Sequence, residues 1–259
     1  MGRGTENKID RIDRDTVKSS AFRGVSKEIR RISAVRESLM AFTMTHLIIS
    51  KNISEAFESR IGNLPQFYLG TIAPDAVHNR ADYSPDFKKA SHLYAGPERW
   101  GMITNHGEWI NSVITFFNER KNSGDRDFII GYCTHVLTDI YNNKNEWIPF
   151  KERYPGEIEK GYGNRHHQES GRIDIELALT YDGREMFRQY LAASRSIDLP
   201  EIIYAGEMNE QVNNILNLWY KDKKRPDIAS NTIVTYESNM DFIKEASGFA
   251  ADVLRELLL

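Results

Sequence analysis

Hydrophobic residues recur at helical spacing along most of the chain after about residue 45, and no stretch alternates apolar and polar positions as a strand would. Helices with one apolar face are predicted at residues 45–57, 105–120, 125–142, 165–180, 182–194, 207–220 and 238–259. In the last of these, Phe242, Ala246, Phe249 and Val253 form a continuous apolar stripe. The pattern predicts an all-α fold made of a single multi-helix domain.

Polar and proline-containing stretches divide these helices. Residues 1–25 are polar and predicted to form a mobile tail, and residues 26–39 can form an amphipathic helix that begins a single domain of residues 26–259. The stretches 63–87 and 149–163 contain prolines and are predicted to be loops. The first of these loops carries several Asp and Asn residues that could bind a ligand.

Composition limits the classes of function. A chain of 259 residues that is 40% hydrophobic can bury one sizeable core, and its net charge of −3 provides no basic surface for long DNA or RNA. One cysteine excludes an internal disulfide and a Cys-rich zinc site. No stretch of 18 apolar residues and no apolar signal segment occurs, so we expect no membrane span and a cytoplasmic protein. The sequence does not indicate the oligomeric state.

The predicted helix 125–142 places two polar residues on its apolar face. His135 and Asp139 are four positions apart and share that face with Phe128, Tyr132 and Val136. A metal ion could contact both side chains, but a buried hydrogen-bonded pair would explain them equally well.

Further histidines and aspartates lie in apolar or turn contexts of the first 140 residues. The set comprises His46, Asp75, His78, His92, His106, His135 and Asp139. Because thiolates are absent, metal binding here would use imidazole nitrogens and carboxylate oxygens. His78 is expected to lie at the surface or behind a metal ligand, and His106 to cap a helix or line a pocket.

Four motifs, "MTHLI", "LGTIAPDAVH", "KKASHLYAG" and "GYCTHVLTDIY", occur in this order. Together they resemble the bacterial zinc-dependent phospholipase C family, which is all-helical and related to the S1/P1-type nucleases. The resemblance covers roughly residues 40–180 and implies that Asp75, His92, His135 and Asp139 hold a zinc ion. It also implies that His46 binds a neighbouring metal and that Asp139 can bridge two ions. One or two zinc ions, or other divalent metals, are therefore expected.

The family supplies more ligands from a His followed by His-x-x-x-Glu. The stretch "RHHQESGRID" departs from this spacing but offers His166 and Glu169 as additional metal ligands. The family also uses its N-terminal amine, whereas 45 residues precede His46 in this chain. A complete three-metal site, a one- or two-metal site and an inactive site are all compatible with this pattern.

The resemblance implies a metal-dependent phosphoester hydrolase in which a metal-activated water attacks phosphorus, with Asp75 and Asp139 as catalytic residues. The expected substrate is a small phosphoester or a phospholipid headgroup. An HD-type phosphohydrolase is strongly disfavoured because none of the seven histidines precedes an Asp. The alternative is a catalytically inactive helical domain with a structural metal site or a buried polar network, serving regulation or protein association.

Overall fold

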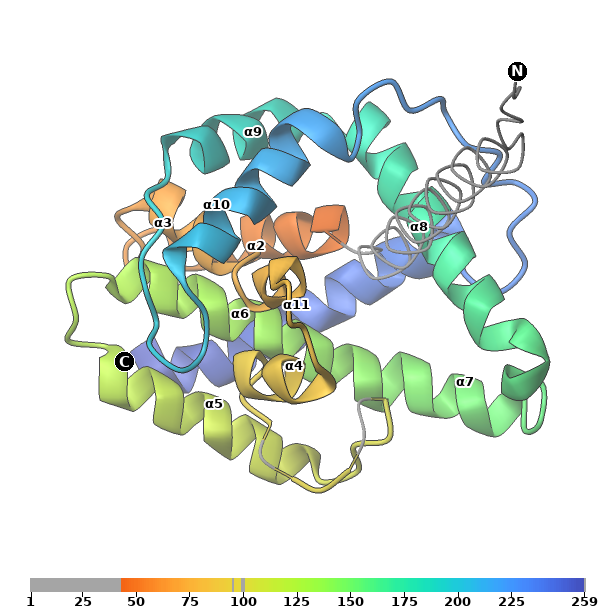
Figure 1. Ribbon diagram of the computed structural model, residues 1–259, viewed down its shortest axis with the longest axis horizontal. Coiled ribbons are helices and arrows are strands. Elements are labelled where there is room, and N and C mark those ends of the chain that lie inside the picture. The colour runs from red at the N-terminus through yellow and green to blue at the C-terminus, as the bar shows by residue number, and fades with distance from the viewer. Residues whose placement is uncertain (1–42, 95, 99–100, 259) are drawn as a thin grey trace, which may run out of the picture. The chain divides into compact units, whose positions relative to one another are not determined.

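The computed structural model describes residues 43–94, 96–98 and 101–258, which fold into helices joined by turns (Figure 1). The α-helices, labelled as in Figure 1, are α2 (Thr43–Ala56), α3 (Leu64–Gly70), α4 (Pro85–Ser91), α5 (His106–Arg120), α6 (Arg126–Asn142), α7 (Ile148–Arg153), α8 (Gly163–Thr180), α9 (Arg184–Ala193), α10 (Ala205–Asn213) and α11 (Tyr236–Leu258). Shorter turns are the 3-10 helix η1 (Pro74–Asn79) and the π-helical η2 (Asn143–Trp147), η3 (Ile158–Tyr162) and η4 (Asn214–Leu218).

The described part of the chain contains no β-strand beyond an isolated bridge between Leu199 and Ile203, so the all-α prediction is confirmed. The predicted tail 1–25 and the predicted helix 26–39 lie outside the described residues.

Helix α6 occupies the centre of the described fold. It packs against α2, α3, α5 and α11, which surround it in Figure 1. Every residue from 128 to 138 is buried, including the single cysteine, Cys133. A polar side chain in this part of α6 must therefore form its hydrogen bonds or ion pairs with other buried groups of the protein.

Prolines begin helices where we expected loops. Pro65, Pro74, Pro85 and Pro149 lie in the first turns of α3, η1, α4 and α7. The loop predictions for 63–87 and 149–163 were therefore wrong over these segments. The physical reason is that an N–H in the first turn has no intrahelical acceptor, so a proline there removes no hydrogen bond.

Two glycines allow α3 and α6 to cross with their backbones in contact. A Cβ atom on Gly70 would lie 2.1 Å from the carbonyl oxygen of Phe128, and one on Gly131 would lie 2.0 Å from that of Phe67. Neither position has room for a side chain. This close crossing brings the end of α3 beside the turn of α6 that carries His135.

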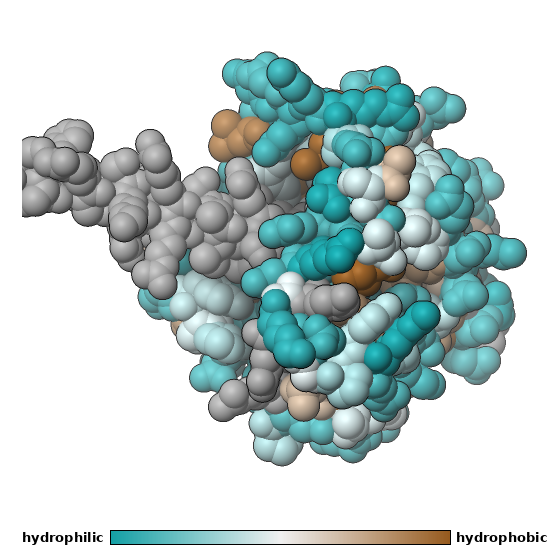
Figure 2. Space-filling view, turned by 90° about the vertical axis from the view of Figure 1, so that its right-hand side faces the viewer, coloured by the Kyte–Doolittle hydropathy of each residue, from teal (hydrophilic) through white to brown (hydrophobic). Residues whose placement is uncertain are grey.

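Hydrophilic residues cover most of the described surface on the face drawn in Figure 2, where hydrophobic residues appear only in small groups. The large hydrophobic side chains that are exposed are Met102, Tyr204 and Leu218. Among the described helices, none has both the length and the apolar character needed to cross a bilayer.

Candidate metal centre

His135 is held in a defined orientation on α6. Its side chain is buried, and its Nδ1 donates a hydrogen bond of 2.8 Å to the backbone carbonyl of Thr71, at the end of α3. Because a carbonyl can only accept, Nδ1 carries the hydrogen, and Nε2 of the neutral ring presents a lone pair. Metal-ligating histidines are commonly oriented by such a bond.

His92 has the same arrangement at the C-terminal end of α4. It is fully buried, and its Nδ1 donates to the carbonyl of Lys88 over 3.0 Å. Its own carbonyl accepts a hydrogen bond of 2.7 Å from the indole of Trp109. The Nε2 atoms of His92 and His135 face each other at 3.4 Å.

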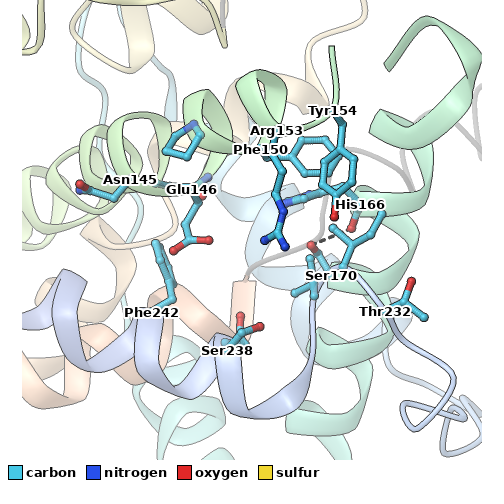
Figure 3. A pocket seen from close by; sticks show the side chains of 15 residues that line it. Asn145, Glu146, Phe150, Arg153, Tyr154, His166, Ser170, Thr232, Ser238 and Phe242 are labelled. Atoms are coloured by element: carbon cyan, nitrogen blue, oxygen red, sulfur yellow. Dashed lines mark hydrogen bonds between the residues drawn. The ribbon is translucent and has the colours of Figure 1, made fainter. Parts of the chain in front are cut away.

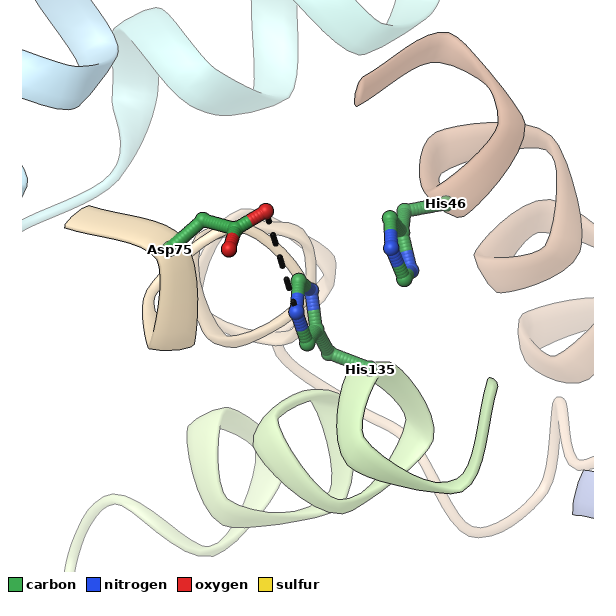
Figure 4. Close-up of side chains that lie close together, drawn as sticks. All are labelled: His46, Asp75 and His135. Carbon is green, nitrogen blue, oxygen red and sulfur yellow. Dashed lines mark ion pairs between the residues drawn. The ribbon is translucent and has the colours of Figure 1, made fainter. Parts of the chain in front are cut away.

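Asp75 from η1 and His46 from α2 approach His135 from two sides, as Figure 4 shows. One Asp75 oxygen lies 3.9 Å from Nε2 of His135, and the other lies 3.4 Å from Nε2 of His92. The rings of His46 and His135 stack at 3.9 Å with an interplanar angle of 8°. The side chain of Asp75 is 27% exposed, so the group has a solvent-facing side.

Asp139 completes the group and contacts all three imidazoles. Its Oδ2 lies 3.2 Å from Nε2 of His92 and 3.6 Å from that of His135, and its Oδ1 lies 3.5 Å from Nε2 of His46. The structure thus brings together the side chains predicted as ligands: His46, Asp75, His92, His135 and Asp139. We call these five residues the His/Asp cluster.

The electrostatics of the cluster favour ionised carboxylates. Burial alone would raise the pKa of Asp75, but Lys88, His92 and His135 hold it well below its usual range. Burial is likewise overcome at Asp139, whose pKa is lowered strongly by the surrounding imidazoles. The cluster therefore contains two partly buried negative charges that require positive compensation.

The pKa values of His135 and His46 are shifted in opposite directions. Burial lowers the pKa of His135, but the contact with the Asp139 carboxylate and the negative charge of that carboxylate outweigh it and raise the pKa. The pKa of His46 is lowered, first by burial and then by His135. Nδ1 of His46 is buried with no hydrogen-bond partner among the described residues.

The distances in the cluster fit a cation better than direct hydrogen bonds. Hydrogen bonds between nitrogen and oxygen are about 2.7–3.2 Å long, whereas the nitrogen–oxygen distances here are 3.4–3.9 Å except that between His92 and Asp139, which is 3.2 Å. In a tetrahedral shell with bonds of about 2.0–2.2 Å, ligand atoms lie roughly 3.3–3.6 Å apart. Three imidazoles and two carboxylates are also the donors that zinc takes when thiolates are absent. The residues present therefore fit a divalent metal.

Two charged or polar side chains border the cluster at Asp75. Nζ of Lys88 and Nε2 of His78 each lie 3.7 Å from Oδ1 of Asp75. Burial lowers the pKa of His78 to about 4, so its ring is neutral at physiological pH. His78 thus lies behind Asp75, in the position expected for it.

His166 and Glu169 are placed elsewhere on α8. The Glu169 carboxylate accepts hydrogen bonds from the backbone N–H groups of residues 232, 233 and 234 and from Arg165. The His166 ring lies against Trp147 and Phe150. Neither residue belongs to a group of candidate metal ligands among the described residues, and the bonds of Glu169 give it a structural role.

Comparison with known proteins identifies no relative: no family model, curated protein or solved structure matches this chain. The resemblance noted in the sequence therefore rests on the four quoted motifs. The function has to be argued from the chemistry of the cluster itself.

Proposed function

We propose that this protein is a metal-dependent phosphoester hydrolase and that the His/Asp cluster is its active site, with zinc as the expected metal. The observation that carries this proposal is the convergence of lone pairs from two fixed imidazoles and two carboxylates at 3.2–3.9 Å. His46 adds a third imidazole, 3.5 Å from Asp139.

A bound divalent ion would lower the pKa of a coordinated water toward about 7 and neutralise charge on a phosphoryl oxygen. The chain supplies the rest of the chemistry. Thr71 and the carbonyl of Lys88 fix the tautomers of His135 and His92, so both Nε2 atoms can act as ligands. Asp139, in contact with three imidazoles, is suited to contact two ions with one carboxylate.

Substrate would approach from the side of Asp75, the more exposed of the two cluster carboxylates at 27% against 13% for Asp139. The ammonium of Lys88 lies beside Asp75 and would attract an anionic phosphoester. A small phosphomonoester, phosphodiester or phospholipid headgroup is the substrate class that we propose. A net charge of −3 argues against long nucleic acid.

The test combines metal analysis of protein purified without chelator with a screen of chromogenic phosphoesters. We expect at least one equivalent of zinc or a similar metal, and turnover that chelation abolishes and zinc restores. Absence of both metal and turnover would contradict the proposal.

A structural metal site is the second candidate, and the deep burial of His92 and His135, each at most 1% exposed, favours it. Structural zinc sites are closed, with protein ligands at every position. Stoichiometric metal without turnover on any phosphoester, and without a metal-bound water detectable by spectroscopy of the cobalt-substituted protein, would support this candidate.

A further inference from the structure

A cavity of about 280 Å³ opens between the η2–α7 segment, α8, residues 232–234 and the first turns of α11 (Figure 3). Its volume lies near the lower end of the roughly 300–1,000 Å³ typical of small-molecule sites. No member of the His/Asp cluster lines it, so it is distinct from the candidate metal centre.

Two opposite charges face this cavity. Glu146 of η2 and Arg153 of α7 are seven positions apart, and Figure 3 shows both side chains pointing into the space in front of α11. Neither forms a hydrogen bond or ion pair with a described residue, although Arg153 lies 5.7 Å from the ring centre of Tyr154. Both side chains are exposed to solvent, so the mouth of the cavity presents one carboxylate and one guanidinium that do not pair with each other.

The lining of the cavity is mixed: polar side chains predominate, two phenylalanine rings contribute apolar surface, and one polar atom is unsatisfied. Phe150 and Phe242 are buried and form apolar walls. His166 is also buried, and its Nδ1 has no hydrogen-bond partner among the described residues. Burial raises the pKa of Glu146, and repulsion by Glu245 adds to this, as expected for a carboxylate without a cation beside it. A ligand could supply a counter-charge for Glu146 and a hydrogen bond for the buried Nδ1 of His166.

We propose that this cavity binds a small zwitterion with an ammonium group, a carboxylate and an apolar side chain, as in an amino acid or a short peptide. The ammonium would pair with Glu146, and the carboxylate with the planar fork of Arg153, which matches carboxylate geometry. One guanidinium balances one negative charge, and the apolar side chain would pack between Phe150 and Phe242.

Calorimetric titration of the full chain tests this proposal. The probes are phenylalanine and alanyl-phenylalanine, compared with phenethylamine, which lacks the carboxylate, and 3-phenylpropionate, which lacks the ammonium. We expect one zwitterion to bind at least about tenfold more tightly than either singly charged analogue, because each loses one charge-assisted contact. The same titration with chelator should give the same affinity, since the metal centre is not involved.

Matched variants locate the binding. Glu146→Gln and Arg153→Gln should each weaken zwitterion binding about tenfold or more. Lys144→Gln and Glu152→Gln change exposed charges on the same helical segment but outside the cavity, and should leave the affinity unchanged. Circular dichroism confirms that each variant is folded. The proposal is wrong if no zwitterion shows saturable binding, if a singly charged analogue binds equally well, or if either cavity variant keeps the wild-type affinity.

Discussion

Asp139 is the side chain on which the candidate metal centre depends most. It is the cluster residue that lies within 3.6 Å of three imidazole nitrogens, and its charge is maintained although it is only 13% exposed. Removing one charge of a buried, compensated group usually leaves its partners uncompensated. The consequences of a change at Asp139 should therefore concern the metal before the fold.

The substitution Asp139→Asn keeps the shape of the side chain and removes its negative charge. We expect loss of at least one metal equivalent and of most phosphoesterase turnover, because metal cations in the cluster would be less well compensated. Metal analysis and turnover of a chromogenic phosphoester measure the effect. The far-UV circular dichroism should not change, since Val136 and Ile140 still pack on the same helix.

Asp241→Asn is the matched control, because Asp241 is exposed on α11 and outside the cluster. It should retain wild-type metal content and turnover. If Asp139→Asn also retains both, Asp139 is not a ligand, and its contacts with the imidazoles belong to a buried polar network.

The sequence predicted the members of the cluster better than their surroundings. His135 and Asp139 could be paired because a four-residue spacing stacks side chains on one helix face. Asp75 and His92 were predicted as ligands because the order of four motifs resembles that of a known family. The carbonyl groups of Thr71 and Lys88 that orient the two imidazoles were not predictable, because every residue has a carbonyl and only the fold determines which one is near.

The crossing of α3 and α6 couples helix packing to the geometry of the His/Asp cluster. Gly131 lies one turn before His135, whose Nδ1 binds the carbonyl of Thr71 beside α3. Gly131→Ala would place a methyl group 2.0 Å from the carbonyl oxygen of Phe67 and force the helices apart. We expect a loss of unfolding free energy of about 3 kcal/mol or more, together with weaker metal binding. Urea unfolding and metal titration measure the two effects.

Gly248→Ala on α11 is the control for this change. A Cβ atom there would meet no other atom within 4 Å, so the substitution should be neutral or stabilise the helix. Equal stability of Gly131→Ala and Gly248→Ala would contradict the backbone contact between α3 and α6.

Glu169 joins α8 to the segment that leads into α11. Its carboxylate accepts hydrogen bonds from three successive backbone N–H groups, with lengths of 3.0, 2.6 and 2.9 Å. Burial alone would raise its pKa, but these bonds and Arg165 lower it. The charged carboxylate therefore stabilises the fold at neutral pH, and this contribution is lost as the pH falls through the lowered pKa.

Glu169→Gln should reduce the free energy of unfolding by about 2–3 kcal/mol at pH 7, because hydrogen bonds to a charged acceptor are replaced by weaker ones. The difference from wild type should shrink below about pH 4, where the carboxyl of the unfolded chain is protonated. Urea unfolding at both pH values tests this, with exposed Glu256→Gln as the control. A difference independent of pH would show that the charge of Glu169 is not what stabilises the contact.

Hydrophobic periodicity predicted the long helices but not the short ones. Helices α5, α6 and α11 have 15, 17 and 23 residues, which is enough for an apolar face to repeat several times. Helices α3, α4 and α7 have 7, 7 and 6 residues, too few for a period to be recognised. In these segments the prolines are the strongest local signal, and that signal predicts a loop.

At the scale of the whole molecule, metal binding should increase the free energy of unfolding and raise Tm. A ligand that binds only the folded state adds about 2.7 kcal/mol when present at 100 times its dissociation constant. For a domain of this size we expect zinc to raise Tm by roughly 5–10 °C over the chelated protein. Scanning calorimetry measures the shift, and Asp139→Asn should reduce it. Identical Tm values with zinc and with chelator would argue against a metal in the cluster.

The burial of Cys133 makes the rate at which its thiol is alkylated a measure of how often α6 opens. This thiol is the chain's only cysteine and lies fully buried on α6, between Gly131 and His135. Since burial also raises the pKa of the thiol, an alkylating reagent can reach a reactive form only when α6 leaves the core. The rate of labelling therefore measures how often the central helix opens. A metal bound between α6, α2, η1 and α4 should slow labelling about tenfold for each 1.4 kcal/mol of stability that it adds.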